Sequence, residues 1–252
     1  MSAAPPPVRL DAEPIPHRIG LIALATDMTT EMDYALALTP RGIAVHTTRI
    51  PFANPVTPET LAAMGPDLTA AAALILPGET LDAVVYSCTS ASVVIGDVAV
   101  REAIAAGKPG AEPITPISAG FAALRALGAR RITLVTPYTA ETTRPMAECF
   151  AAGGFDLAGV TSLGLTDDRA MARISHNSIV EAARAAVAPG SEALFFACTA
   201  VRAAEVIDRI EAAIGIPAVS ANHATAWAAL RACGDQGAAG PGRLMTLPMG
   251  RS

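Results

Sequence analysis

The 252-residue sequence predicts an α/β fold made of two similar lobes, each a parallel sheet flanked by helices. Three observations carry this prediction. Strand-like apolar runs alternate with Ala-rich helical patterns, and the second half of the chain repeats motifs of the first. In both halves a strand-like run ends in a cysteine followed by a threonine. Hydrophobic residues make up 52% of the chain and charged residues 16%, which suits a packed core and argues against disorder.

Eight short apolar runs read as strands because they are rich in branched and aromatic residues and are bounded by turn formers. They span residues 18–26, 44–51, 82–88, 112–118, 131–137, 156–164, 192–198 and 216–221. Helical patterns lie between them, among them residues 59–76, 119–128, 140–153, 176–188, 200–214 and 223–233. Such alternation predicts parallel strands with helices on both faces of each sheet.

A shift of 110 residues lays "LATDMTTE" (24–31) on "LVTPYTAE" (134–141) and Cys88 on Cys198. A third match, "AALRALG" (122–128) with "AALRACG" (228–234), follows in the same order. Two related lobes imply a pseudo-twofold axis between them, and parallel sheets bind ligands at the carboxyl ends of their strands. Since both cysteines end strands, we expect Cys88 and Cys198 to face each other across one small-molecule cleft.

Each of these cysteines is followed by hydroxyl residues, in "YSCTSAS" (86–92) and "FFACTA" (195–200), and by a predicted helix. Backbone N–H groups at a helix start favour a thiolate and can also hold a substrate carboxylate. Cys149 and Cys233 lie inside helical patterns and are interpreted as packing residues.

Composition also narrows the functional classes. A net charge of −5 without a basic run makes a nucleic-acid partner unexpected. No apolar stretch approaches the roughly 18–20 residues that span a bilayer. Residues 1–16 are expected to form a flexible leader without the features of a secretory signal. The four cysteines show no CxxC pair or zinc-type spacing, so we expect reduced thiols, a cytoplasmic protein and no metal.

The motifs resemble the cofactor-independent aspartate/glutamate racemase superfamily. Within it the chain is most similar to the branch of maleate cis–trans isomerases and arylmalonate decarboxylases, which also holds racemase-like proteins of ectoine utilisation. The resemblance runs from about residue 18 to 245. It rests on "YSCTSAS", "ALRALGARRITLVTPYTAE", "SLGLTDDRAMARIS", "FFACTA" and "IPAVSANHATAWAALRACG".

This resemblance implies flavodoxin-like lobes, with lobe 1 formed by 17–115 plus 218–252 and lobe 2 by 116–217. It also implies a small carboxylate substrate, no metal or other cofactor, and a homo-oligomer of two or more subunits. Isomerase and racemase members use both cysteines whereas the decarboxylases keep only the second, so the presence of Cys88 points away from decarboxylation. Residues matching the family's substrate contacts are Tyr138, for the carboxylate, and Thr89, Ser90 and Thr199, which follow the cysteines.

Two departures from the maleate isomerase pattern concern the substrate. "TDMTTEM" places Met28, with Asp27 beside it, where that pattern has a carboxylate-binding Asn, and Asp168 in "TDDRA" falls at or next to a second Asn. Carboxylates there would repel a dicarboxylate and suit an ammonium or amidinium group. The alternative is that both aspartates cap helices and face solvent. His176 and His223 are interpreted as bases behind the site or as helix-start residues without a catalytic role.

The leading hypothesis is a racemase of amino-acid metabolism, in which one cysteine removes an α-proton and the other protonates the opposite face. The first alternative is a maleate-type cis–trans isomerase, in which a thiolate adds to an alkene and forms a covalent intermediate. The second is a two-lobed protein that binds a small molecule without catalysis.

Overall fold

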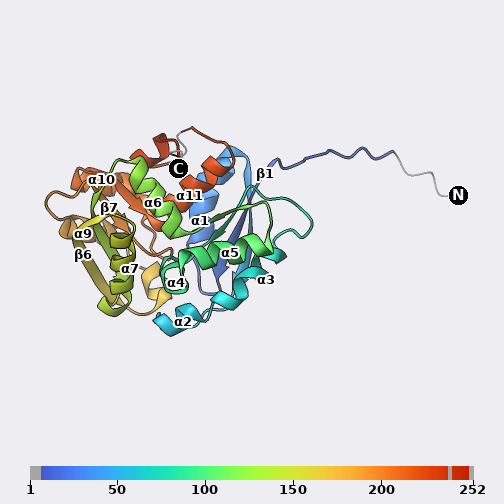
Figure 1. Ribbon diagram of the computed structural model, residues 1–252. Helices are drawn as coiled ribbons and strands as arrows, with labels where there is room; N and C mark the ends of the chain where they lie inside the picture. The colour runs from blue at the N-terminus through green and yellow to red at the C-terminus, as the bar shows by residue number, and fades with distance from the viewer. Residues whose placement is uncertain (1–6, 238–239, 250–252) are drawn as a thin grey trace.

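The computed structural model describes residues 7–237 and 240–249, and within them eight strands form two four-stranded sheets (Figure 1). The first sheet has the order β2-β1-β3-β4 and contains β1 (His17–Leu24), β2 (Ile43–Ile50), β3 (Ala83–Tyr86) and β4 (Glu112–Ile114). All its strand pairs are parallel.

The second sheet repeats this arrangement. It has the order β6-β5-β7-β8, with β5 (Arg131–Tyr138), β6 (Asp156–Leu165), β7 (Ala193–Phe196) and β8 (Ala218–Ser220), again all parallel. The same strand order within each half agrees with the duplication read from the sequence. The predicted fold class of two lobes, each a helix-flanked parallel sheet, is confirmed.

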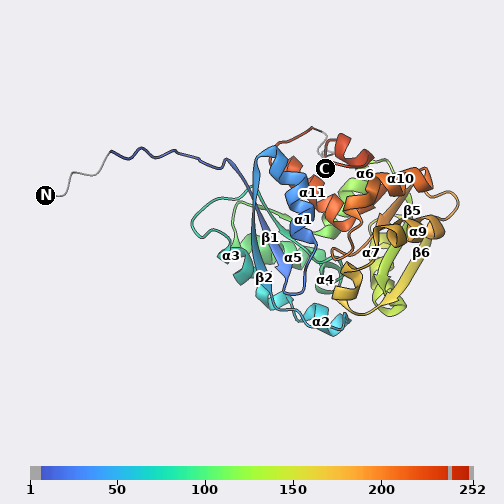
Figure 2. The same cartoon turned by 180° about the vertical axis from the view of Figure 1, so that it is seen from behind.

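Helices cover these sheets on both faces (Figures 1 and 2). Their bounds are α1 (Thr30–Leu38), α2 (Pro58–Ala62), α3 (Leu68–Leu74), α4 (Thr89–Ile95), α5 (Asp97–Gly107), α6 (Pro116–Ala126), α7 (Ala140–Ala152), α8 (Asp168–Ala172), α9 (His176–Ala186), α10 (Ile207–Ile214) and α11 (Ala221–Ala232). Short 3₁₀ turns occupy Thr39–Arg41, Gly65–Asp67, Ala204–Val206 and Arg243–Thr246. In the described part of the chain, no helix has the length and apolar character needed to cross a membrane.

The strands that precede the two cysteines lie inside their sheets and are completely buried. β3 reads AVVY and β7 reads ALFF, with no exposed position in either. Since helices cover both faces of a parallel sheet, inner strands are continuous apolar runs rather than alternating ones. Burial fixes both strands, and therefore fixes where each following cysteine leaves its sheet.

Helices α6 and α11 lie side by side where the two lobes meet (Figures 1 and 2). Each follows the last strand of its sheet, β4 or β8, and then packs at the junction. The strand at 218–220, which the sequence assignment placed in lobe 1, pairs with β7 and therefore belongs to the second sheet. The chain returns to the first lobe through α11, after β8.

Two predicted helices are shorter than expected. The pattern at 59–76 is divided into α2, a 3₁₀ turn and α3, because Pro66 has no backbone N–H with which to continue the α-helical hydrogen bonds. The pattern at 200–214 becomes α10, which begins only at Ile207. Of the predicted leader, residues 1–6 lie outside the described residues, and residues 7–16 are exposed, contain no helix or strand and extend away from the lobes (Figure 1).

Close packing of α5 on α3 gives a test of the fold. A Cβ added at Gly107 would lie 2.2 Å from the Thr69 carbonyl oxygen and 2.9 Å from the Ala72 Cβ, so Gly107→Ala must displace backbone. We expect urea denaturation to show a loss of about 1–3 kcal/mol in the free energy of unfolding. Gly65→Ala is the control, since its nearest contact would be Ile95 at 3.7 Å. Equal stability of the two variants would contradict this packing.

Candidate active site

Cys88 and Cys198 lie two residues beyond the ends of β3 and β7, and each is only 5% exposed. Both thiols line one cavity between the lobes, as the duplication predicted. The cavity is lined by Leu24, Phe52, Val56, Leu61, Cys88, Ser90, Tyr138, Asp168, Cys198 and Thr199. Its free volume is about 10 Å³, which is room for about one water molecule, so the structure shows a closed cleft.

Buried hydrogen bonds connect the two cysteine segments. The Thr199 hydroxyl donates to the Ser87 carbonyl at 3.1 Å, which joins the residue after one cysteine to the residue before the other. The Thr199 carbonyl in turn accepts from the Thr29 hydroxyl at 3.0 Å and from the Asn222 amide at 2.8 Å. These bonds fix the position of one thiol relative to the other.

The loop between β2 and α2 closes the cavity. Val56 N–H donates to the Thr166 carbonyl at 2.8 Å, and the Asn54 side chain accepts from Asp168 N–H at 3.0 Å. Phe52 and Val56 from this loop form part of the apolar wall of the cavity. The sequence analysis missed these residues, although the apolar "RIPFANPV" after a strand end (49–56) is the kind of segment that covers a cleft.

Cys88 is the N-cap residue of α4, as expected. Burial raises the pKa of its thiol to about 11, while hydrogen bonds from Ala91 N–H and the Ser90 hydroxyl oppose this rise by favouring the thiolate. The Ser90 oxygen lies 3.7 Å from the Cys88 sulfur. A helix start therefore supports the Cys88 thiolate directly.

Cys198 has a different local structure from its repeat partner. Its φ of 85° lies in the left-handed region, which non-glycine residues adopt at a cost and which is often found at functional sites. Turns and a 3₁₀ helix follow it, so the expected helix directly after Cys198 is wrong. Burial first, and then the negative charge of Asp168, raise the pKa of the Cys198 thiol well above its usual range.

Tyr138 lies in the cavity as the resemblance implied. Its hydroxyl is in hydrogen-bonding contact with Cys198 and Ser90, and burial raises the pKa of this phenol well above its usual range. Its hydrogen bond favours the Cys198 thiolate. Tyr138 thus bridges a residue of each lobe at the position where the thiols meet.

Asp168 also lines the cavity, and it is the one charged side chain among the lining residues that the structure describes. Its carboxylate accepts from the Thr26 hydroxyl at 2.6 Å, across the lobe junction. Burial raises the pKa of Asp168, opposed by this hydrogen bond and assisted by the charge of Asp27. Asp168 is buried, so the alternative of a solvent-facing cap does not describe it.

Asp27 and Met28 are not among the residues that line this cavity. The Asp27 carboxylate accepts from Thr29 N–H and Thr30 N–H, both at 2.9 Å, and from the Thr30 hydroxyl at 2.6 Å. It caps the start of α1 as a buried group. Met28, the repeat counterpart of the buried Tyr138, is 54% exposed. The geometry gives no support to a substrate contact from either side chain.

The hydroxyl residues after the cysteines divide into two groups. Ser90 and Thr199 line the cavity, although the Thr199 hydroxyl already donates to Ser87. Thr89 is fully buried, does not line the cavity, and its hydroxyl has no hydrogen-bond partner within the described residues.

A larger cavity of about 430 Å³ lies between α1, α10 and α11 and is lined by Asp33 and His223 among others. It contains no cysteine. His223 there bonds through Nε2 to the Pro241 carbonyl at 2.8 Å, and burial lowers its pKa to about 4. His176 pairs instead with Glu205 at 3.3 Å. Neither histidine lines the cysteine cavity, which we take as the reactive site because it holds both thiols.

Comparison with known proteins identifies the family of this chain. Residues 67–245 match the family model described as arylmalonate decarboxylase. The maleate isomerase of Nocardia farcinica is 30% identical over 228 residues, covering 85% of this chain and 89% of that protein. The arylmalonate decarboxylase of Bordetella bronchiseptica is 34% identical over 147 residues, but this match spans only 59% of its length.

A solved structure extends the likeness to three dimensions. It is the N. farcinica maleate cis–trans isomerase as a cysteine-to-serine mutant with a covalently bound succinylcysteine intermediate. The TM-score is 0.80 at 29% identity, covering 91% of this chain and 98% of that one. The chain belongs to the family of arylmalonate decarboxylases and maleate isomerases, and it is an enzyme of that family whose two cysteines lie in one closed cavity.

Proposed function

We propose that the protein is a cis–trans isomerase of a small unsaturated carboxylate of the maleate type, with Cys88 as the nucleophile and Cys198 as the proton donor. The observation that carries the proposal is that two buried thiols from different lobes line one cavity. The succinylcysteine in the related maleate isomerase supports a covalent path, and this support favours cis–trans isomerisation over racemisation.

The roles of the two thiols follow from their surroundings. Cys88 is the N-cap residue of α4, and Ala91 N–H and the Ser90 hydroxyl stabilise its thiolate. Cys198 has no α-helix start directly after it, and burial and the charge of Asp168 raise its pKa, which favours the protonated thiol. A nucleophile must be a thiolate and a general acid must hold a proton, so Cys88 is assigned to attack and Cys198 to proton transfer.

In the proposed reaction the Cys88 thiolate forms a C–S bond with one alkene carbon. The π electron pair moves to the other carbon and its carboxylate, and Cys198 gives that carbon a proton. The remaining C–C single bond rotates. Cys198 then takes the proton back, the C=C bond re-forms in the trans geometry, and the C–S bond breaks to return the Cys88 thiolate. These steps use only groups of the chain and of the substrate.

The substrate carboxylates require donors in a cavity without a lining Lys or Arg. Ser90 and Tyr138 supply hydroxyl groups, and the start of α4 supplies N–H groups. Asp168 repels a carboxylate while ionised. Burial raises the pKa of Asp168 and the hydrogen bond from Thr26 opposes this rise, so we place the substrate carboxylates against Ser90, Tyr138 and the α4 N-terminus rather than against Asp168. A maleate-type substrate carries no ammonium group, so the ammonium-binding role expected from the sequence has no part in this proposal.

Closed as it is, the cavity admits a substrate only if the loop carrying Phe52 and Val56 moves. Closing this loop over the substrate then removes water, which strengthens the hydrogen bonds at the reacting atoms. Assembly into a homo-oligomer and a cytoplasmic location remain predictions from the sequence.

Racemisation is the second candidate, since two thiols on opposite sides of one cavity also suit proton exchange at an α-carbon. Proton NMR in D2O separates the two, with maleate and both enantiomers of aspartate and glutamate as the panel. We expect maleate to become fumarate. Inversion of an amino acid with loss of its α-proton signal, without fumarate, would overturn the proposal in favour of racemisation.

Replacing either cavity cysteine should stop the reaction. For Cys88→Ser and Cys198→Ser we expect kcat for maleate to fall by about 10²–10⁴-fold or more, because a nucleophile or a general acid is lost. Cys149→Ser, which changes a half-buried thiol outside the cavity, is the matched control and should keep full activity. Full activity in either cavity variant would exclude the mechanism.

Covalent catalysis should leave a visible adduct. In Cys198→Ser, solvent supplies the proton that completes the adduct and no thiolate removes it again, so mass spectrometry after incubation with maleate should show a mass gain of one maleic acid, located by digestion at Cys88. Cys88→Ser should show none. An adduct at Cys149 or Cys233 with equal occupancy would mean non-specific alkylation and would remove this support.

Asp168→Asn tests the charge in the cavity, and it retains an oxygen to accept from Thr26. Removing the carboxylate should lower the KM for maleate by about tenfold, since like charges no longer repel. Because the Asp168 charge raises the pKa of both thiols, the rise of kcat/KM with pH should also move to lower pH. Asp156→Asn, a change at an exposed position of lobe 2, should do neither. An unchanged KM and pH profile in Asp168→Asn would show that this carboxyl does not face the substrate.

A further inference from the structure

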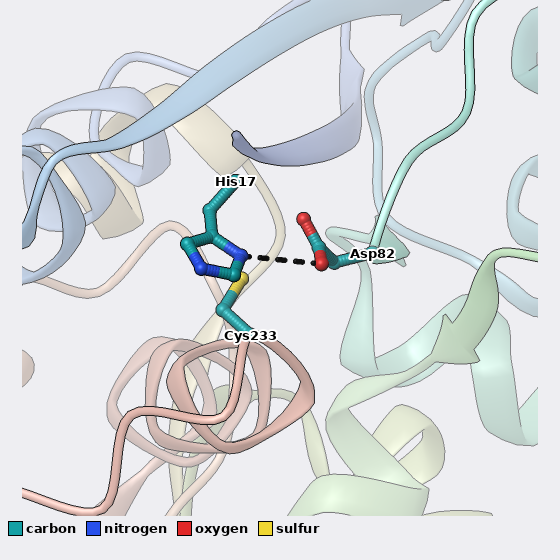
Figure 3. A group of neighbouring side chains, drawn as sticks. All are labelled: His17, Asp82 and Cys233. Atoms are coloured by element: carbon teal, nitrogen blue, oxygen red, sulfur yellow. Dashed lines mark hydrogen bonds and ion pairs between the residues drawn. The ribbon is translucent and has the colours of Figure 1, made fainter. Parts of the chain in front are cut away.

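Three side chains with metal-binding atoms meet at the end of lobe 1 that is remote from the cysteine cavity. His17 begins β1, Asp82 directly precedes β3, and Cys233 is the C-cap residue of α11. One donor atom of each, an imidazole nitrogen, a carboxylate oxygen and a sulfur, lies within 4.8 Å of the other two. Figure 3 shows the three side chains converging, with His17 and Asp82 in contact.

This cluster is separate from the proposed active site. β1 and β3 are parallel neighbours, with Ile19 opposite Ala83, so His17 and Asp82 lie together at their amino ends. Cys88 and its cavity lie beyond their carboxyl ends. The strands therefore separate the cluster from the reacting thiols, and the cluster has no part in the mechanism above.

Contacts around the cluster hold the carboxylate in place. Asp82 accepts from Arg18 N–H through Oδ2 at 2.8 Å, which leaves Oδ1 facing His17 Nδ1 at 3.4 Å. The guanidinium of Arg18 is turned to Glu79 at 3.0 Å rather than to Asp82. One oxygen of Asp82 is thus directed toward the histidine and the cysteine.

The surrounding charge suits a cation. Burial, and then the negative charges of Asp82 and Asp235, raise the pKa of the Cys233 thiol. Neighbouring guanidinium groups are already engaged, since Arg41 pairs with Asp235 at 3.4 Å and Arg231 donates to the Asp235 carbonyl at 2.7 Å. A divalent ion would compensate the carboxylate and a thiolate together, which His17 alone does not do.

We propose that His17, Asp82 and Cys233 form a binding site for a divalent metal ion and that its donor set selects Zn²⁺. Nitrogen, carboxylate oxygen and thiolate sulfur are the three ligand types zinc takes in proteins, and a solvent molecule completes four-coordination. On binding, the S–H bond of Cys233 is replaced by a metal–sulfur bond and the proton passes to solvent.

Only small movements are needed to form the site. Zinc–ligand distances of about 2.0–2.3 Å require the donors to approach somewhat closer than they do here. The His17 side chain is 45% exposed at the start of its strand, so its ring has room to turn. The bound ion would join the first strand, the segment before β3 and the end of α11, which are far apart in sequence. It would therefore stabilise the fold in proportion to the concentration of free metal.

Cobalt(II), a coloured substitute for zinc, tests the proposal with the full-length protein. We expect one Co²⁺ per chain with the near-ultraviolet charge-transfer absorption of a cobalt–thiolate bond, displaced by Zn²⁺, and a melting temperature that rises with added Zn²⁺. Cys233→Ser should lose this absorption. Asp82→Asn should weaken metal affinity by about 10–100-fold while keeping the size of its side chain. Circular dichroism establishes that each variant is folded.

The other cysteines provide the controls. Cys149→Ser and the double variant Cys88→Ser/Cys198→Ser should both keep the cobalt–thiolate absorption. Absence of that absorption in the unmodified protein would overturn the proposal. So would its persistence in Cys233→Ser together with its loss in the double variant, since the metal would then bind at the active-site thiols. Maleate isomerisation is measured separately, so either result leaves the proposed function to its own tests.

Discussion

The hydrogen bond from the Thr199 hydroxyl to the Ser87 carbonyl is the contact on which the site depends. It spans the two lobes and directly adjoins both cysteines. Thr29 and Asn222 donate to the Thr199 carbonyl, so the same residue is held to both lobes through its backbone as well. A buried hydrogen bond of this kind contributes about 1 kcal/mol, and leaving its partners unpaired costs about 1–3 kcal/mol. The same hydrogen bond that joins the two lobes therefore also positions the two thiols relative to each other.

Burial imposes a compromise on the two thiols. A dry cavity makes hydrogen bonds to a reacting carboxylate stronger, but it also opposes formation of the thiolate that attacks. The two repeats resolve this differently. Cys88 gains the start of α4, whereas Cys198 adopts left-handed backbone and has no α-helix start directly after it. This local difference between the repeats is what the proposed division into a nucleophile and an acid rests on.

The two edges of the first sheet carry different chemistry. At the carboxyl edge, both thiols and the hydroxyl groups beside them line a closed cavity between the lobes. At the amino edge, His17, Asp82 and Cys233 join three segments of lobe 1 to one another. A metal ion there would stabilise the first strand and α11, the helix that also supplies Asn222 to the lobe junction.

The sequence by itself determined the fold class, nearly all the strands, the duplication and the pairing of Cys88 with Cys198, because each depends on local periodicity or on a repeat visible along the chain. The family resemblance also named Ser90, Tyr138, Asp168 and Thr199, all of which line the cavity. Tertiary structure decided the rest. Asp27 turned out to cap its own helix, the exposed Met28 has no place in the cavity, and the loop with Phe52 and Val56 supplies its wall. The cluster of His17, Asp82 and Cys233 escaped a search for zinc spacing because its donors come from three distant segments. Strand pairing and helix packing bring these three side chains together. Because the three residues are far apart along the chain, no local sequence pattern shows that they are close in space.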